Sequence, residues 1–172
     1  MKKYLLILMT LIGMMTMVSC DDKSQYVGEW VSDTHEEDDF SAVIHLTLQE
    51  GGTAYIEIKA RGVDDTTDIP LKVTYTMKTS GKWDASLGFL DLEFDPNKVK
   101  CDLDDIKAED PTATALIRMV LADSETRNEL KEELTKEVDV TDFNGSLEAD
   151  LVDDNTLVLT DDDGEVIKFY KK

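Results

Sequence analysis

FSAVIHLTLQEGGTAYIEIKAR, residues 40–61, is the stretch that decides the fold. On both sides of Gly51-Gly52, apolar and polar residues alternate with a period of two, which places the apolar side chains on one face of a strand. Two such runs joined by a glycine turn predict a β-hairpin, and its one dry face is typical of an antiparallel sheet. The dry face comprises Phe40, Ala42, Ile44, Leu46, Leu48, Ala54, Ile56, Ile58 and Ala60.

The same alternation recurs on both sides of this hairpin and predicts eight to ten strands in up-and-down order. Turn residues separate the runs, with predicted turns at Ser80-Gly81, Asp153-Asn155 and Asp161-Gly164. An acidic loop is expected at 35–39 and a polar loop at 62–68. Besides the hairpin, the predicted strands are 26–31, 69–78, 82–85, 90–94, 138–140, 145–151, 156–160 and 165–170.

One segment, about 102–137, breaks this period and predicts a helical insert before the last strands. A helical turn is expected at 103–108, and Asp110-Pro111 is a good helix start because Asp can cap free N–H groups. A polar stretch at 123–126, together with the capping-box spacing of Thr126 and Glu129, predicts a break near Ser124. We expect the helices to cover an open end or side of the sheet, with Ile117, Val120 and Leu121 packed on it.

The N-terminal segment has the layout of a signal peptide over residues 1–19, with two lysines followed by an apolar run too short for a stable membrane span. Met17-Val18-Ser19-Cys20 resembles a bacterial lipoprotein lipobox, which implies lipidation of Cys20 and a tether at 20–25. The acidic residues after Cys20 resemble the surface-export signal of Bacteroidetes lipoproteins. We therefore expect a cell-envelope protein, lipid-anchored to the outer membrane and exposed on the cell surface.

The chain is strongly acidic, with a net charge of −20 that becomes −22 when Lys2 and Lys3 leave with the signal peptide. Such a surface repels phosphate backbones and anionic headgroups, which excludes nucleic acid as an expected partner. Cationic proteins, cationic ligands and divalent metals stay open, although net charge alone also keeps a tethered protein soluble.

Catalytic and metal-binding patterns are absent from the sequence. Cys101 is expected to be a small buried thiol, and His35 and His45 are too few and too isolated for a zinc site. The run Asp161–Gly164 does not fit the EF-hand template, because the twelfth position would be Tyr170. We therefore expect no enzyme, no metal and no cofactor.

An early Gly28-x-Trp30, the lipobox, the β-meander and the closing run LVLTDDDGE (157–165) resemble the lipocalin-like lipoproteins of Bacteroidetes. The resemblance covers most of 26–172 except the insert at about 102–137. It implies a mainly β domain, an up-and-down antiparallel barrel of about eight strands, closed at one end by Gly28 and Trp30. True lipocalins have an Arg stacked on that Trp from the last strand, where this chain has only Lys168, Lys171 and Lys172.

Two functions follow as expectations for such a barrel. The first is a non-catalytic binding module, monomeric, that takes a small apolar ligand in the barrel, with Tyr75, Met77, Phe89 and Phe94 as the ligand-facing residues. Their bulk, together with Phe40, also favours a barrel filled by its own side chains. The alternative is an acidic protein-binding module, such as an inhibitor of a cationic secreted enzyme, which rests on the net charge.

Overall fold

The computed structural model describes residues 23–37, 40–64, 70–137, 140 and 143–172. The signal peptide (1–19), Cys20 and the start of the tether lie outside the described residues. The end of the predicted tether is wrong, because residues 23–25 belong to a short 3-10 helix, η1 (Lys23–Tyr26), in which Tyr26 is buried. The chain is therefore docked on the domain from Lys23 onward.

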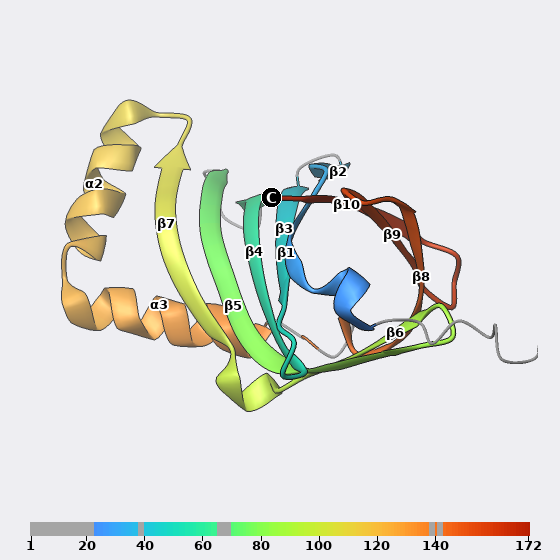
Figure 1. Cartoon of the computed structure of the whole chain (residues 1–172). Helices are drawn as coiled ribbons and strands as arrows, with labels where there is room; N and C mark the ends of the chain where they lie inside the picture. The colour runs from blue at the N-terminus through green and yellow to red at the C-terminus, as the bar shows by residue number, and fades with distance from the viewer. Residues whose placement is uncertain (1–22, 38–39, 65–69, 138–139, 141–142) are drawn as a thin grey trace, which may run out of the picture.

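The described residues form ten strands, two 3-10 helices and two α-helices (Figure 1). The strands are β1 (Gly28–Ser32), β2 (His35–Glu37), β3 (Phe40–Leu48), β4 (Thr53–Asp64), β5 (Leu71–Ser86), β6 (Phe89–Phe94), β7 (Lys100–Ala108), β8 (Gly145–Asp153), β9 (Thr156–Thr160) and β10 (Val166–Lys171). A second 3-10 helix, η2 (Pro96–Lys98), links β6 to β7. Part of the predicted acidic loop is thus strand β2, and residues 38–39 lie outside the described part.

Eight of these strands close into an antiparallel barrel, in the order β1-β10-β9-β8-β6-β5-β4-β3. The ring closes at β1, which pairs with β3 on one side and with β10 on the other, so that Trp30 lies opposite both Leu46 and Lys171. The predicted up-and-down barrel is confirmed, as is the hairpin around Gly51-Gly52. Closure leaves the ring without free strand edges, the usual hazard of an open antiparallel sheet.

Strand β5 is longer than predicted and is shared between two neighbours. Its first half pairs with β7 and its second half with β6 (Figure 1). The predicted turn at Ser80-Gly81 is wrong, because both residues lie inside β5. A Cβ at Gly81 would lie 2.0 Å from the carbonyl oxygen of Glu93, so glycine serves close strand approach there.

The chain instead turns between β5 and β6 at Leu87-Gly88, a two-residue loop closed by the pair Ser86–Phe89. Both loop residues have positive φ, 54° at Leu87 and 80° at Gly88. A two-residue hairpin of type I′ requires this, and Asn or Gly is preferred at the first position because a leucine there is strained.

We predict that Leu87→Asn raises the free energy of unfolding by about 0.5–1 kcal/mol, because Asn tolerates the left-handed conformation and the Leu87 side chain is 77% exposed. Urea unfolding measures the change as a higher midpoint at constant slope. Leu87→Ala is the matched control, since it removes the same side chain but keeps the strain. Equal stability of the two variants would contradict the prediction.

The predicted helical turn at 103–108 is wrong, because this segment belongs to strand β7. Cys101 and Leu103 are buried and Asp102 is exposed, but a β-bulge opposite Thr74 and Tyr75 then shifts the register. After the bulge Ile106 takes the buried face. The inserted residue disturbs the period of two in the sequence, so the alternation does not indicate a strand there.

Two helices, α2 (Pro111–Leu121) and α3 (Ser124–Glu137), form the helical insert, and the predicted break near Ser124 is confirmed. The helical part begins at Pro111 rather than at about 102. Both helices contact β7 outside the barrel ring, where α2 runs beside the strand and α3 runs across it (Figure 1). The Arg127 guanidinium donates to the Leu103 carbonyl, and the Thr114 hydroxyl bonds both backbone groups of Ala108. The helices therefore cover the exposed edge of β7.

Of the three α2 residues predicted to pack on the sheet, Ile117 and Leu121 lie on the inward side of the helix and Val120 does not. Ile117 and Leu121 are only half-buried, Val120 is 58% exposed, and no residue of α2 is buried. Of the predicted strand 138–140, Val140 is buried but not in a strand, and residues 138–139 lie outside the described part. No helix within the described residues is long and apolar enough to cross a membrane.

Candidate functional site

One end of the barrel is plugged by aromatic side chains and η1. Trp30 is fully buried, and its indole N–H donates to the carbonyl of Tyr26 over 2.8 Å. The Lys171 ammonium lies 5.1 Å from the centre of the Trp30 ring, in the manner of a cation–π contact. Lys171 therefore places a cation over the ring of the buried tryptophan.

Gly28 makes room for this stack. A Cβ built at Gly28 would lie 2.9 Å from Cε of Lys171, and the φ of 150° disfavours any side chain. The predicted barrel-closure residues Gly28 and Trp30 thus lie together at the plugged end. Gly28 lies against the aliphatic part of the Lys171 side chain, and the Trp30 ring lies under the Lys171 ammonium group.

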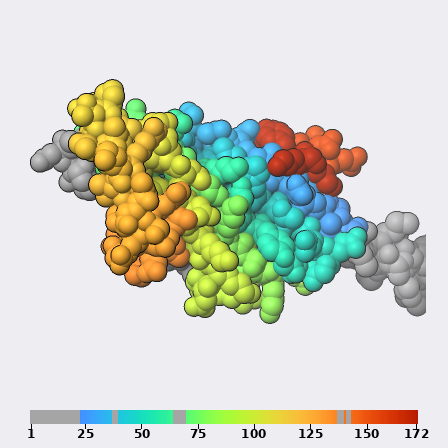
Figure 2. Space-filling model, turned by 90° about the vertical axis from the view of Figure 1, so that its left-hand side faces the viewer, coloured from blue at the N-terminus to red at the C-terminus, as the bar shows by residue number. Residues whose placement is uncertain are grey.

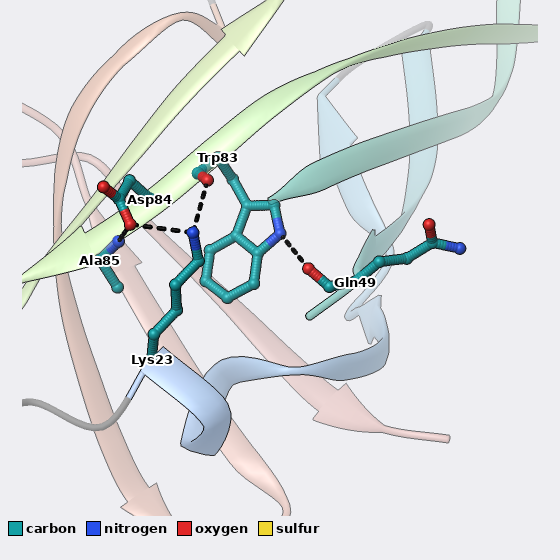
Figure 3. Close-up of polar contacts among 5 residues, drawn as sticks. All are labelled: Lys23, Gln49, Trp83, Asp84 and Ala85. Carbon is teal, nitrogen blue, oxygen red and sulfur yellow. Dashed lines mark hydrogen bonds and ion pairs between the residues drawn. The ribbon is translucent and has the colours of Figure 1, made fainter. Parts of the chain in front are cut away.

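A second lysine–tryptophan pair lies at the same end (Figure 3). The Lys23 ammonium lies 4.6 Å from the centre of the Trp83 ring and also donates to the Trp83 carbonyl and to Asp84. The indole N–H of Trp83 donates to the carbonyl of Gln49 over 2.9 Å. These contacts hold the first described residue on the barrel wall, and the Lys23 hydrogen bond lowers the pKa of the Asp84 carboxyl.

We predict that Trp30→Phe lowers the free energy of unfolding by about 1–3 kcal/mol, because the buried Tyr26 carbonyl loses its donor. Thermal or urea unfolding measures the loss. Tyr55→Phe is the matched control: Tyr55 is 45% exposed, so its change should stay within about 0.5 kcal/mol. A Trp30→Phe variant as stable as this control would contradict the role assigned to Trp30.

The interior holds a cavity of about 350 Å³. Its apolar wall comes from β3, β4, β6, β8, β9 and β10 and from Phe143. The lining residues are Ile44, Leu46, Ile56, Leu92, Phe143, Leu147, Leu159, Ile167 and Phe169, with Asp161 and Glu165. The cavity lies in the range of small-molecule pockets, roughly 300–1,000 Å³, at its lower end.

Asp161 and Glu165 are the two acidic residues of this lining, and both belong to the turn between β9 and β10. The turn lies at the other end of β10 from Lys171, so the acidic rim is opposite the plug. The Asp161 carboxylate accepts hydrogen bonds from the backbone N–H groups of Asp163 and Glu165, and so shapes the turn. Among the described residues, Glu165 forms no ion pair.

None of the four residues predicted to face a ligand lines the cavity. Phe94 is buried in the core, and Met77 and Tyr75 face inward where β5 pairs with β7, opposite Cys101 and Leu103. Phe89 is 45% exposed on the outer face of β6, where Leu90, Leu92 and Phe94 take the inner positions, so its prediction as an inward residue is wrong. Phe40, also expected inside, is 38% exposed.

The apolar cavity-lining residues that the sequence does not single out are mostly Ile and Leu at inward strand positions, together with Phe143 and Phe169. Their period of two marks them as inward-facing, but the same pattern holds for side chains that fill the core. The one further signal was the acidic turn 161–165, which ends two of the lining strands.

Cys101 is the free cysteine among the described residues. Cys101 is buried as predicted, and burial raises the pKa of its thiol, although a hydrogen bond with Thr135 acts in the opposite direction. A raised pKa makes the thiol a poor nucleophile at neutral pH. Within the described part of the chain, no three His, Cys, Asp or Glu side chains gather in a group that could hold a metal ion.

Comparison with models of known protein families gave no match, and comparison with curated protein sequences gave none. The resemblance to lipocalin-like lipoproteins therefore stays a prediction from the motifs, beside a barrel that has the architecture it implies.

Proposed function

We propose that this protein is a lipid-anchored binding module of the cell envelope whose barrel takes a small, mainly apolar ligand without catalysing a reaction. The observation that carries the proposal is the cavity of about 350 Å³ enclosed by inward-facing Ile, Leu and Phe side chains. A preformed apolar cavity gains roughly 0.8 kcal/mol for each ligand methylene group that it removes from water. It needs no reorganisation of the strands to do so.

The rim restricts the polar end of such a ligand. Asp161 and Glu165 place carboxylates at the mouth, and Asp162 and Asp163 are exposed on the same turn. A ligand carboxylate or phosphate held there would meet like charges, whereas an ammonium group would be attracted. The ligand class that fits is therefore an apolar molecule with a neutral or cationic end.

The location is proposed from the N-terminal sequence. The signal-peptide pattern and the lipobox-like Met17–Cys20 support attachment through lipid on Cys20, with the outer membrane as the site and the cell surface as the exposed side. The chain itself is proposed to be a monomer, since its net charge of −20 disfavours self-association.

We predict that filling the cavity weakens binding of a neutral apolar probe, N-phenyl-1-naphthylamine, whose fluorescence rises in apolar sites. Leu147→Trp and Ile167→Trp place an indole in the cavity from two different strands, β8 and β10, and should raise the Kd at least about tenfold. Val152→Trp, outward-facing on β8 and 61% exposed, is the matched control and should leave the Kd unchanged. Circular dichroism verifies that each variant keeps its β structure.

Two results would contradict this function: no probe binding by the wild-type chain, or equal binding by the cavity variants and Val152→Trp. Because Ile167 is 37% exposed, its substitution is expected to leave the fold intact even where Leu147→Trp overpacks the core.

The rim gives a second prediction. Glu165→Gln should weaken binding of a long-chain amine and strengthen binding of the carboxylate of the same chain length, each about two- to fivefold, as expected for one exposed charge pair. Glu148→Gln, the same charge change on the exposed outer side of β8, is the control and should alter neither. Titration calorimetry at low and high salt measures the Kd of both ligands. An amine preference that is the same in the wild type and in Glu165→Gln would contradict the role of the rim.

A further inference from the structure

Helix α2 turns its most apolar side chains toward solvent. Leu116, Met119 and Val120 are 59%, 72% and 58% exposed, and their spacing of i, i+3 and i+4 places them on one side of the helix. We refer to these three residues as the α2 stripe. A surface helix normally buries such a stripe against its own core, and α2 has no buried residue at all.

Other contacts hold α2 in place. Asp110 caps the helix by accepting from the Thr112 N–H over 2.7 Å, the Thr114 hydroxyl bonds both backbone groups of Ala108, and Arg118 forms an ion pair with Asp105. The half-buried positions Ala113, Thr114, Ile117 and Leu121 form the inward side. The α2 stripe is therefore dispensable for packing within this chain, and its exposure leaves apolar area for another molecule.

In the space-filling view, α2 (yellow) and α3 (orange) lie together at one end of the molecule, with β7 beside them (Figure 2). The stripe is thus accessible from solvent. It belongs to no wall of the barrel cavity, so a function there is independent of the proposed ligand.

The charges around the stripe restrict what can cover it. Acidic residues flank α2 at both ends, Glu109 and Asp110 before it and Asp123 and Glu125 after it. Its one basic residue, Arg118, is already paired with Asp105. Helices that lie on membranes carry Lys and Arg on the polar face, and a second copy of this chain would bring another −20 charge close.

We propose that the α2 stripe is a docking surface for another protein, one whose apolar groove is rimmed by Lys and Arg side chains. The helix fits such a groove as an amphipathic ligand, with Leu116, Met119 and Val120 as its anchors. The carboxylates at the two ends of α2, of which Asp110 and Asp123 also cap helices, make the surroundings of the stripe negative, and a basic rim complements that charge and speeds association.

The test uses the full chain expressed in its native cells, with the photo-crosslinking residue benzoylphenylalanine at Val120 and, in a control, at Glu132 on the exposed side of α3. Irradiation should give one protein adduct at Val120 that is absent at Glu132. Mass spectrometry identifies the adduct and the crosslinked residue of the partner. A dimeric adduct of this chain, a lipid adduct, or no adduct specific to Val120 would overturn the proposal.

The captured protein is then purified and titrated with the full chain. Leu116→Gln/Met119→Gln, which removes apolar area but keeps the charge and a good helix former, should weaken binding about 10- to 100-fold. Val152→Thr, an equally exposed apolar site on β8, should leave it unchanged, and added salt should slow association. Binding that is unaffected by the double variant, or by salt, would overturn the proposal. Both readouts are independent of whether the barrel binds N-phenyl-1-naphthylamine.

Discussion

Strand β5 has to pair with two different strands along one edge, and the rest of the structure depends on how it does so. Over Leu71–Lys78 that edge carries β7, and over Gly81–Ser86 it carries β6, while β4 follows the other edge along most of its length. The missing side chain of Gly81 lets the β6 backbone approach at the point where the two partners change. Because β6 and not β7 continues the ring, the barrel closes with eight strands and leaves β7 outside it. The edge of β7 then needs the helices, whose Arg127 and Thr114 side chains bond backbone groups of β7.

The sequence predicts this fold where a residue pattern is compatible with a single structure, and it fails where the same pattern is compatible with two. Alternation along Phe40–Ala60 has one meaning, since a single inner face is buried, and the hairpin and the barrel follow from it. A glycine in a strand pattern can mark either a turn or the close approach of another strand, and Gly81 marks the close approach of β6. Alternation also fails across the bulge in β7, where one added residue exchanges the inner and outer faces. The break between α2 and α3 was predictable because capping residues give a local signal.

The candidate site was far less predictable than the fold. Its wall is assembled from inward residues of six strands, and Ile44 or Leu159 in the wall has the same sequence context as Leu48 or Leu157 in the filled core. The prediction of Tyr75, Met77, Phe89 and Phe94 as ligand-facing residues is not matched by the cavity lining, for a related reason. Size and apolarity predict burial, and Phe94 and Met77 are buried, but so are the cavity-lining Leu46 and Phe169. Burial alone therefore does not distinguish a side chain that lines the cavity from one that fills the core. Only the acidic turn at its mouth distinguished this region in the sequence.

At the plugged end, two lysines each cover a tryptophan ring: Lys171 lies over Trp30 and Lys23 lies over Trp83. Both indole N–H groups are satisfied by backbone carbonyls, so each ring is fixed in the plane that the ammonium covers. The last strand thus supplies a cation over the buried tryptophan although it contains no arginine.

Fixing Lys23 on the barrel wall has a consequence for orientation at a bilayer. Only two residues, Asp21 and Asp22, separate Lys23 from Cys20, and the three residue steps from Cys20 to Lys23 reach about 10 Å at full extension. With the proposed acyl chains on Cys20, the plug would rest near the headgroups, and the cavity mouth at the turn that joins β9 to β10 would point away from the bilayer. A guest molecule would then enter and leave through the surrounding water rather than by lateral partition from the lipid.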